Sequence, residues 1–153
     1  MKMVVILNNI RSNENVGSIF RTCDAVGVSK IFLVGYTPAP LDRFGRENRG
    51  LTKASLGAEK VVAWEKVEDL NSKIEELKIE GFKIIGIEQS PKSINYKLLV
   101  TNFKLALIFG NEVGGLSKED LKFCDLVVEI PMKGSKESLN VAVCVGVVLF
   151  SLS

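Results

Sequence analysis

Short apolar runs recur along the chain, separated by polar turns and by segments with helical spacing. They are Val4–Leu7, Lys30–Val34, Val61–Ala63, Lys83–Ile87, Leu105–Phe109 and Leu126–Ile130. Near-continuous apolar runs of this length are typical of parallel strands that are covered on both faces. The runs therefore predict the strands of a mostly parallel sheet.

Helical patterns fill the segments between these runs. In Asn13–Val28 the helical spacing is carried by Val16, Ile19, Phe20, Cys23 and Val26. Further helices are expected at Val67–Glu80, Ser117–Phe123 and Ser138–Leu152. The last is almost wholly apolar, so we expect it to be deeply packed or buried at a subunit interface. The alternation predicts an α/β fold, a mostly parallel sheet flanked by helices, in one domain over residues 1–153.

The composition supports an ordinary core and excludes several kinds of site. Of the 153 residues, 46% are hydrophobic and 25% are charged, which suits one folded domain. The chain has no histidine, which excludes histidine-based acid–base catalysis, a Ser-His-Asp triad and most zinc sites. The net charge of +2 shows no general basicity, so nucleic-acid binding would require a local patch.

The cysteines and the first residues bear on the setting of the protein. Cys23, Cys124 and Cys144 are widely spaced and form no CxxC pair. We therefore expect buried free thiols, no metal site, and a reducing, cytoplasmic location. The opening MKMVVILNN has too short an apolar run for a signal peptide or a membrane span, so no membrane partner is expected.

The segment Tyr36–Ser55 differs from the rest of the chain. It reads YTPAPLDRFGRENRGLTKAS, with prolines at its start and glycines within it. Its cations are Arg43, Arg46, Arg49 and Lys53, against the anions Asp42 and Glu47. Long loops in compact domains are often functional. A solvated surface loop and a loop that contacts phosphates both remain open.

The first motif is the turn and helix NNIRSNENVGSIFR, residues 8–21. Ser12, Asn13 or Asn15 can cap this helix. Gly17 and Arg21 are four residues apart and share a face. Glycine in a helix is unfavourable by about 1 kcal/mol relative to alanine, so it needs a reason. Either a neighbouring backbone packs closely on Gly17, or Gly17 opens room for a ligand over which Arg21 reaches.

The second motif, IFGNEVGGLS at residues 108–117, follows an apolar run. It therefore lies beyond the carboxyl end of a strand, where open parallel sheets bind ligands. Ser117 and Glu119 suggest a capping box, which does not explain three glycines around Glu112. Those glycines are Gly110, Gly114 and Gly115. Neither GxGxxG nor GxxxxGK[ST] occurs, so a dinucleotide or P-loop phosphate site is not supported.

The third motif, IPMKGSKESLNVAV at residues 130–143, also leads from a strand into a helix. Pro131 ends the strand because it lacks a backbone donor. Ser138 is expected as the helix N-cap. Asn140 would then lie inside the first turn, which is unusual because asparagine prefers caps and turns.

Together the three motifs resemble those of the SpoU, or TrmH-like, branch of the SPOUT RNA methyltransferases. The matching patterns are N-x-G-x-x-x-R (Asn15, Gly17, Arg21), F-G-N-E-x-x-G-L (Phe109 to Leu116), and I-P-M-x-G followed by S-L-N (Ile130 to Gly134, then Ser138 to Asn140). Their order and spacing cover nearly the whole chain. The resemblance implies a C-terminal deep trefoil knot, a homodimer whose site is completed across the interface, and methylation of a ribose 2′-hydroxyl in tRNA or rRNA.

The resemblance also implies the site residues. It implies S-adenosylmethionine as the methyl donor, held by Ile87, Glu88, Gly110, Ile130, Ser138 and Leu139. The catalytic positions it implies are Arg21, Asn15, Glu112, Ser138 and Asn140. No added RNA-binding domain is evident in the sequence. We therefore expect RNA contacts from Arg11, Arg43, Arg46, Arg49 and Lys53.

The mechanism, the RNA and nucleotide on which the same chemistry acts, and two rival functions remain open at this stage. The resemblance implies that Arg21 is the general base. A guanidinium stays protonated, however, so Arg21 is better suited to stabilising alkoxide charge and binding a phosphate. A catalytically inactive knotted RNA-binding or assembly factor is the first rival, but it has no need of all five polar positions. An ordinary Rossmann-like enzyme is the second. It needs a glycine-rich turn after the first strand, where this chain has NNIRSNENVG.

Overall fold

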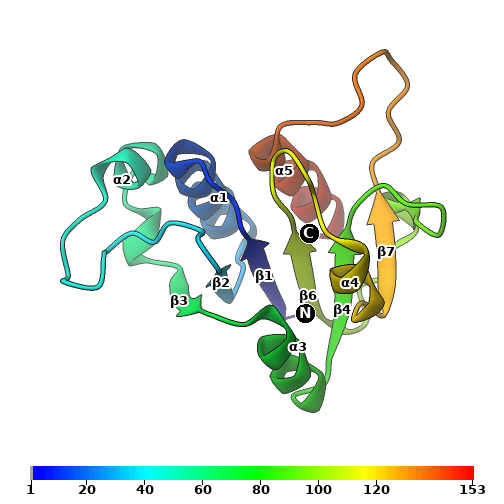
Figure 1. The fold of residues 1–153 in the computed structure, drawn as a ribbon, viewed down its shortest axis with the longest axis horizontal. Coiled ribbons are helices and arrows are strands. Elements are labelled where there is room, and N and C mark those ends of the chain that lie inside the picture. Colours follow the sequence, from blue (N-terminus) through cyan, green and yellow to red (C-terminus); the bar gives the residue numbers. More distant parts are fainter. Residues whose placement is uncertain (1) are drawn as a thin grey trace.

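The computed structural model describes residues 2–153, which form one sheet of parallel strands with helices on both faces (Figure 1). The strands are β1 (Met3–Asn8), β2 (Lys30–Val34), β3 (Ala63–Val67), β4 (Phe82–Ile87), β5 (Ile94–Asn95), β6 (Lys104–Phe109) and β7 (Leu126–Glu129). The helices are α1 (Asn13–Val26), α2 (Arg49–Ser55), α3 (Leu70–Ile79), α4 (Lys118–Lys122) and α5 (Val141–Leu152), with short 3₁₀ turns η1 (Ala58–Lys60) and η2 (Tyr96–Leu98). The sheet order is β3-β2-β1-β6-β4-β7-β5.

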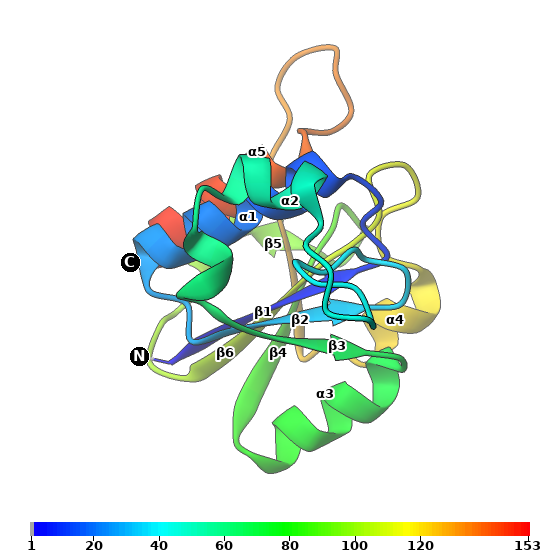
Figure 2. The same ribbon diagram turned by 90° about the vertical axis from the view of Figure 1, so that its left-hand side faces the viewer.

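Each face of the sheet has its own apolar core. Figure 2 shows α1, α2 and α5 on one face and α3 on the other. Along β1, Val5 and Leu7 belong to the cluster under α1 and α5, while Val4 and Ile6 belong to the cluster over α3. All of β1 is buried, as expected for a central strand covered on both sides. The predicted α/β fold with a parallel sheet is confirmed.

The order of the strands decides where loops meet. All pairings are parallel, so every strand ends at the same edge of the sheet. β1 pairs with β6, β6 with β4, and β4 with β7. The loops that follow these four strands are therefore neighbours, although they are far apart in the sequence. The deep trefoil knot implied by the resemblance stays a prediction.

Several predicted element boundaries were wrong at one edge of the sheet. The third strand is Ala63–Val67, displaced from the predicted Val61–Ala63, and the following helix begins at Leu70 instead of Val67. The strand reads AWEKV and is only partly buried. An edge strand needs no continuous apolar run, so its pattern was too weak to place it. The two-residue β5, at the opposite edge, was missed for the same reason.

The segment Tyr36–Ser55 is only partly a loop, because its last third forms α2. The Asn48 side chain caps this helix by accepting a hydrogen bond from the Leu51 amide at 3.3 Å. Only Leu51 and Ser55 of α2 are buried. Seven residues with so narrow an apolar face give little periodic signal.

Gly17 is the contact point between α1 and α2. A Cβ atom there would lie 2.3 Å from the Leu51 carbonyl oxygen and 2.7 Å from the Ala54 Cβ. Gly17 is thus needed for close backbone packing. The expectation that Gly17 opens room for a ligand is wrong: the space is filled by α2.

Gly17→Ala is expected to lower the free energy of unfolding by about 1–3 kcal/mol, because α2 must move to relieve the overlap. Chemical denaturation measures this loss. The matched control is Gly146→Ala in α5, where a Cβ atom meets nothing within 4 Å. That variant should be neutral or stabilising by up to about 1 kcal/mol. Equal behaviour of the two variants would contradict the packing argument.

Candidate active site

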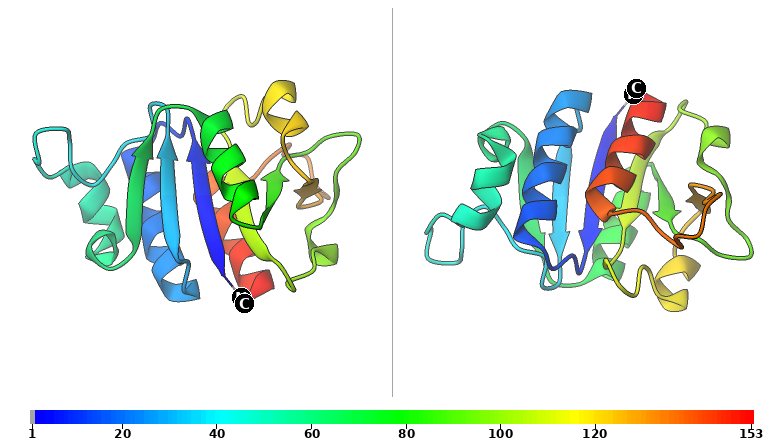
Figure 3. Two further views of the ribbon diagram at one scale, coloured as in Figure 1. Left: turned by 90° about the horizontal axis from the view of Figure 1, so that it is seen from below. Right: turned by 90° about the horizontal axis from the view of Figure 1, so that it is seen from above.

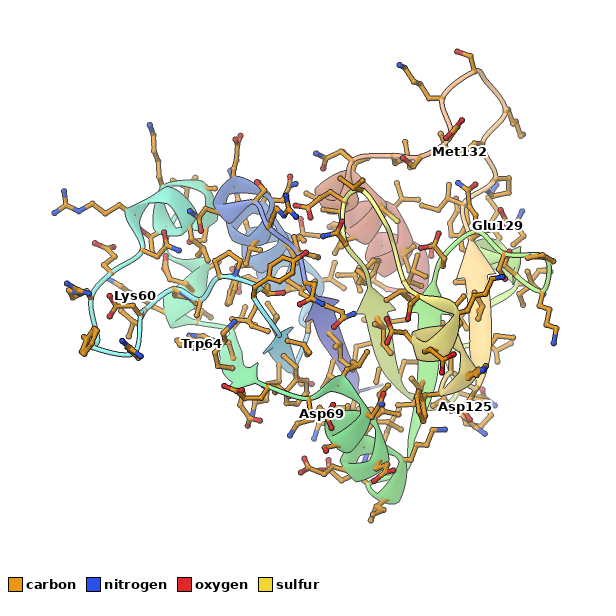
Figure 4. All side chains as sticks on the ribbon, in the orientation of Figure 1. Lys60, Trp64, Asp69, Asp125, Glu129 and Met132 are labelled. Carbon is orange, nitrogen blue, oxygen red and sulfur yellow. The ribbon has the colours of Figure 1, made fainter. Side chains whose placement is uncertain are left out.

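A pocket opens at the carboxyl edge of the sheet, among the loops after β4, β6 and β7 and the start of α5. Its lining includes all the residues expected to hold the methyl donor: Ile87, Glu88, Gly110, Ile130, Ser138 and Leu139. Glu129 and Met132, labelled in Figure 4, contribute from the end of β7 and the loop beyond it. The structure therefore brings these sequence-predicted residues into one cavity.

The glycine-rich loop of this pocket is a tight turn organised by Asn111. The Asn111 side-chain oxygen accepts hydrogen bonds from the amides of Val113 at 2.8 Å and Gly114 at 3.0 Å. Gly115 has a φ of 63°, and a Cβ atom on Gly110 would lie 2.5 Å from the Gly115 carbonyl carbon. Gly110 and Gly115 thus allow the turn to close on itself. Asn111 was not singled out from the sequence, although it stands inside the second motif.

Glu88 holds this loop in place. Its carboxylate accepts hydrogen bonds from the amides of Leu116 at 2.8 Å and Gln89 at 2.9 Å. The Gln89 side chain in turn donates to the Glu137 carbonyl oxygen at 2.6 Å. One wall of the pocket is therefore tied to the loop after β7. Gln89 is a second residue that the sequence did not indicate.

A hydrogen-bonded network joins the three motifs next to the pocket. The Glu112 carboxylate accepts from the backbone amides of Arg11 and Ser12, both at 3.1 Å, and from the Asn15 amide group at 3.4 Å. The Asn15 side-chain oxygen accepts from the Asn140 amide group at 3.2 Å. Asn15 thus meets Glu112 and Asn140, which lie 97 and 125 residues further along the chain.

The network sets the charge of Glu112. Burial opposes ionisation of this carboxyl group, but the hydrogen bonds from Arg11, Ser12 and Asn15 outweigh it, so the pKa of Glu112 is lowered. The carboxylate also lies at the N-terminus of α1, where negative charge is favoured. Glu112 contacts Asn15 and the turn before α1, and no hydrogen bond or salt bridge joins it to Arg21.

Asn140, and not Ser138, is the N-cap of α5. Its side-chain oxygen accepts from the amides of Ala142 at 2.8 Å and Val143 at 3.3 Å. The helix therefore begins three residues later than predicted, and Ser138 lies exposed in the pocket lining. Similarly, the capping box of Ser117 uses Asp120, three residues on as the motif requires, and not Glu119.

Arg21 lies apart from this network within the single chain. It is exposed on α1, six residues beyond Asn15, which is about 9 Å along the helix axis. Arg21 is not among the residues that line the pocket. The expected catalytic residues are thus only partly assembled by one chain.

The expected RNA-binding cations are exposed, and all of them except Arg11 stand on α2 or in the loop before it. Arg43 and Arg46 stand in the loop before α2, while Arg49 and Lys53 line a shallow hollow on the helix itself. Arg11 lies over the ring of Tyr36 at 5.9 Å. The hydroxyl of Tyr36 accepts a hydrogen bond from the Asn111 side chain at 2.6 Å. Tyr36 is therefore linked to the pocket, and no motif indicated it.

The cysteines are free thiols, as predicted, but only Cys23 is fully buried, while Cys124 and Cys144 are partly exposed. Cys144 lines the pocket, and burial, assisted by the charge of Glu88, raises the pKa of its thiol to about 11. Burial raises the pKa of Cys124 to about 11 as well, and raises that of Cys23 further. All are protonated at neutral pH, so they act as packing groups.

Within residues 2–153, none of the helices is both long and apolar enough to cross a bilayer. The same residues contain no group of three or more Cys, Asp or Glu side chains placed to hold a metal ion.

The chain is similar in sequence to known RNA methyltransferases. Residues 2–150 match the family described as the SpoU rRNA Methylase family. The chain is 34% identical, over 148 residues, to a tRNA (guanosine(18)-2'-O)-methyltransferase of Aquifex aeolicus, covering 97% of this chain and 67% of that protein. It is 35% identical, over 147 residues, to a 23S rRNA (guanosine-2'-O-)-methyltransferase of Neisseria meningitidis, covering 96% of this chain and 56% of that protein. The chain thus spans between about half and two thirds of the length of these relatives.

The fold is also similar to those of solved RNA methyltransferase structures. An AdoMet-bound rRNA methyltransferase from Sinorhizobium meliloti superposes with a TM-score of 0.89 at 27% identity, covering 99% of this chain and 55% of that one. The TrmH/SpoU tRNA modifying enzyme of A. aeolicus superposes with a TM-score of 0.85 at 32% identity, covering 99% and 73%.

Glu112→Gln is expected to lower the free energy of unfolding at pH 7 by about 1 kcal/mol, because hydrogen bonds to an ionised acceptor are weakened. Since the pKa is lowered in the folded state, the contribution is present above the ordinary glutamate value of about 4.3 and is lost as pH falls through the folded pKa. Urea denaturation at pH 7 and pH 3 should show the difference between variant and wild type shrinking. The control Glu119→Gln, in an exposed ion pair with Lys122, should change little at either pH.

Asn140→Ala is expected to lower the free energy of unfolding by about 1 kcal/mol, because α5 loses its N-cap. Asn140→Asp keeps the capping oxygen but loses the amide donor to Asn15. It should therefore keep most of the stability in a thermal or chemical denaturation series. A loss as large for the aspartate variant as for the alanine variant would show that the link to Asn15, and not the cap, stabilises the fold.

Proposed function

Because the chain belongs to the SpoU rRNA methylase family, we propose that it is an S-adenosylmethionine-dependent methyltransferase acting on a ribose 2′-hydroxyl of tRNA or rRNA. The observation that carries the proposal is the pocket at the carboxyl edge of β4, β6 and β7, with the Asn15–Glu112–Asn140 network beside it. The names of the relatives, which act on guanosine 2′-oxygens in tRNA and in 23S rRNA, support the reaction class.

The lining of the pocket suits the proposed donor. Apolar walls from Ile87, Phe109 and Ile130 suit a purine ring and an aliphatic chain, which are desolvated in such a site. Glu88, Glu112 and Glu129 line the same space and suit a sulfonium cation. Backbone groups of the glycine loop are accessible because Gly114 carries no side chain. When bound, the donor supplies an electrophilic methyl group.

The side chains of this protein have to position and activate the ribose oxygen. Positioning alone can contribute several kcal/mol to lowering a barrier. In the proposed role Arg21 pairs with the phosphate beside the target ribose and stabilises negative charge that develops on the 2′-oxygen. Asn15 and Asn140, fixed through Glu112, hold the first turn of α1 and the start of α5 in register with the pocket.

A homodimer would complete the site. Arg21 lies outside the pocket of its own chain, which favours its use in the site of a partner protomer. The apolar helix α5 leaves Val143 at 51% and Phe150 at 56% exposed, which is unusual for a helix of this composition. Both observations fit the interface-spanning site that the resemblance implies. Exposed Arg11, Arg43, Arg46, Arg49 and Lys53 are the proposed phosphate contacts.

A methyl-transfer assay tests the proposed function. The purified protein is incubated with radiolabelled S-adenosylmethionine and with total tRNA or rRNA from a strain lacking its gene, and the label is mapped by mass spectrometry. Label on a ribose 2′-oxygen at a defined position is expected. Absence of both methyl transfer and donor binding by calorimetry would favour the inactive RNA-binding factor instead.

Arg21→Ala is expected to reduce the rate of methyl transfer by about 100-fold or more, because charge stabilisation at the reacting oxygen is lost. Donor binding, measured by calorimetry, should stay close to wild type because Arg21 does not line the pocket. The control Lys78→Ala removes an exposed cation from α3, on the opposite face of the sheet. A wild-type rate for Arg21→Ala would remove Arg21 from the mechanism.

A further inference from the structure

An exposed aromatic ring stands at the tip of the loop before α2. Phe44 is 67% exposed, and the guanidinium carbons of Arg43 and Arg46 lie 4.9 Å and 5.1 Å from the centre of its ring. Figure 3 shows this loop projecting beyond α2 at the edge of the molecule. A large apolar ring held out to solvent between two cations serves no core, so it calls for another explanation.

The loop holds its shape through Asp42. One carboxylate oxygen accepts from the amides of Phe44 at 2.8 Å and Arg46 at 2.9 Å, and the other accepts from the Arg46 Nε at 2.8 Å. These bonds to Arg46 and Phe44 lower the pKa of Asp42. A bridge between Leu41 and Glu47 closes the base of the turn. We call residues 41–47 the hairpin.

The hairpin is anchored to the helix that carries Asn15 and Arg21. Asn48, which follows it, donates hydrogen bonds from its side chain to the Asn13 side chain at 2.9 Å and the Ala39 carbonyl oxygen at 3.3 Å. Its backbone amide donates to the Pro40 carbonyl oxygen at 2.9 Å. The base of the hairpin is therefore tied to the start of α1.

We propose that the hairpin is a stacking site for an unpaired nucleobase, in which Phe44 stacks on the base and Arg43 and Arg46 pair with the flanking phosphates. The RNA partner rests on the proposed function, while the stacking site goes beyond it. Exposed cation–π contacts are weaker than base–aromatic stacking, so a base can displace a guanidinium from the ring. The displaced guanidinium then becomes available to a phosphate.

The geometry selects a single-stranded or looped RNA. A ring can stack only on a base whose face is open, and bases inside a duplex are covered by their neighbours. Stacking on a base face is tolerant of sequence, so the hairpin supplies affinity and position without naming the base. Beside it, Arg49, Lys53 and Lys60 line the shallow hollow on α2. Glu47 and Glu59 line it too, so three cations face two anions and the lining keeps a net positive charge.

The first experiment measures RNA binding by the full chain. The probe is an unmodified tRNA transcript, titrated at several salt concentrations. Phe44→Ala is expected to weaken binding by about 5- to 100-fold with the salt dependence unchanged, because stacking releases no counterions. Arg43→Gln is expected to weaken binding and to reduce the salt slope by about 1.

Phe103→Ala is the matched control. Phe103 is 42% exposed with the Lys83 ammonium 5.5 Å from its ring centre, but it lies just before the central strand β6, at the amino ends of the strands. It should bind the transcript like the wild type. Equal binding by wild type and Phe44→Ala would overturn the stacking site, while methyl transfer by the wild type would still support the proposed function.

A fluorescence measurement tests stacking directly. Phe44→Trp places an indole at the tip, in a chain whose other tryptophan is Trp64 on β3. A single-stranded oligoadenylate should quench the emission of this variant and not that of the wild type, and a blunt RNA duplex should quench neither. Equal quenching by single strand and duplex, or quenching by neither, would overturn the proposal.

Discussion

The pocket and the polar network beside it depend on one carboxylate, which joins the loops that follow two neighbouring strands. β1 and β6 lie side by side, so the turn after β1 and the glycine loop after β6 face each other. Glu112 joins them by accepting from two backbone amides of that turn. Without this acceptor, the free amides at the start of α1 would lose their partner and the loop would lose its attachment. The pocket and α1 are thus held in a fixed position relative to each other.

Asparagine side chains connect this loop and α1 to the C-terminal helix α5. Asn15 donates to Glu112 and accepts from Asn140, whose own oxygen caps α5. An amide side chain donates and accepts from two different atoms, whereas an ionised carboxylate can only accept. The residue types at these positions therefore follow from the connection they make, independently of any direct part in the reaction.

The pocket and the hairpin are held in shape by different interactions. Near the pocket, loops are closed tightly by Asn111 and glycines, which gives a fixed shape for a small molecule. At the hairpin, Asp42 provides rigidity while leaving Phe44 and its flanking arginines exposed. Both are preorganised, which reduces the entropy lost on binding. Gly17 brings the hairpin and the pocket together, because it allows α2, which follows the hairpin, to pack directly on α1.

The sequence by itself determined the alternation of strands and helices, because buried parallel strands are continuous apolar runs and helices have a period of 3.6 residues. It also singled out Asn15, Glu112 and Asn140 as candidate site residues, because they belong to motifs that follow the ends of strands. Only the tertiary structure decided that Gly17 faces a helix and that Phe44 is displayed to solvent. Local patterns report periodicity and turn chemistry, whereas the neighbour of a given residue depends on the order in which distant strands pair.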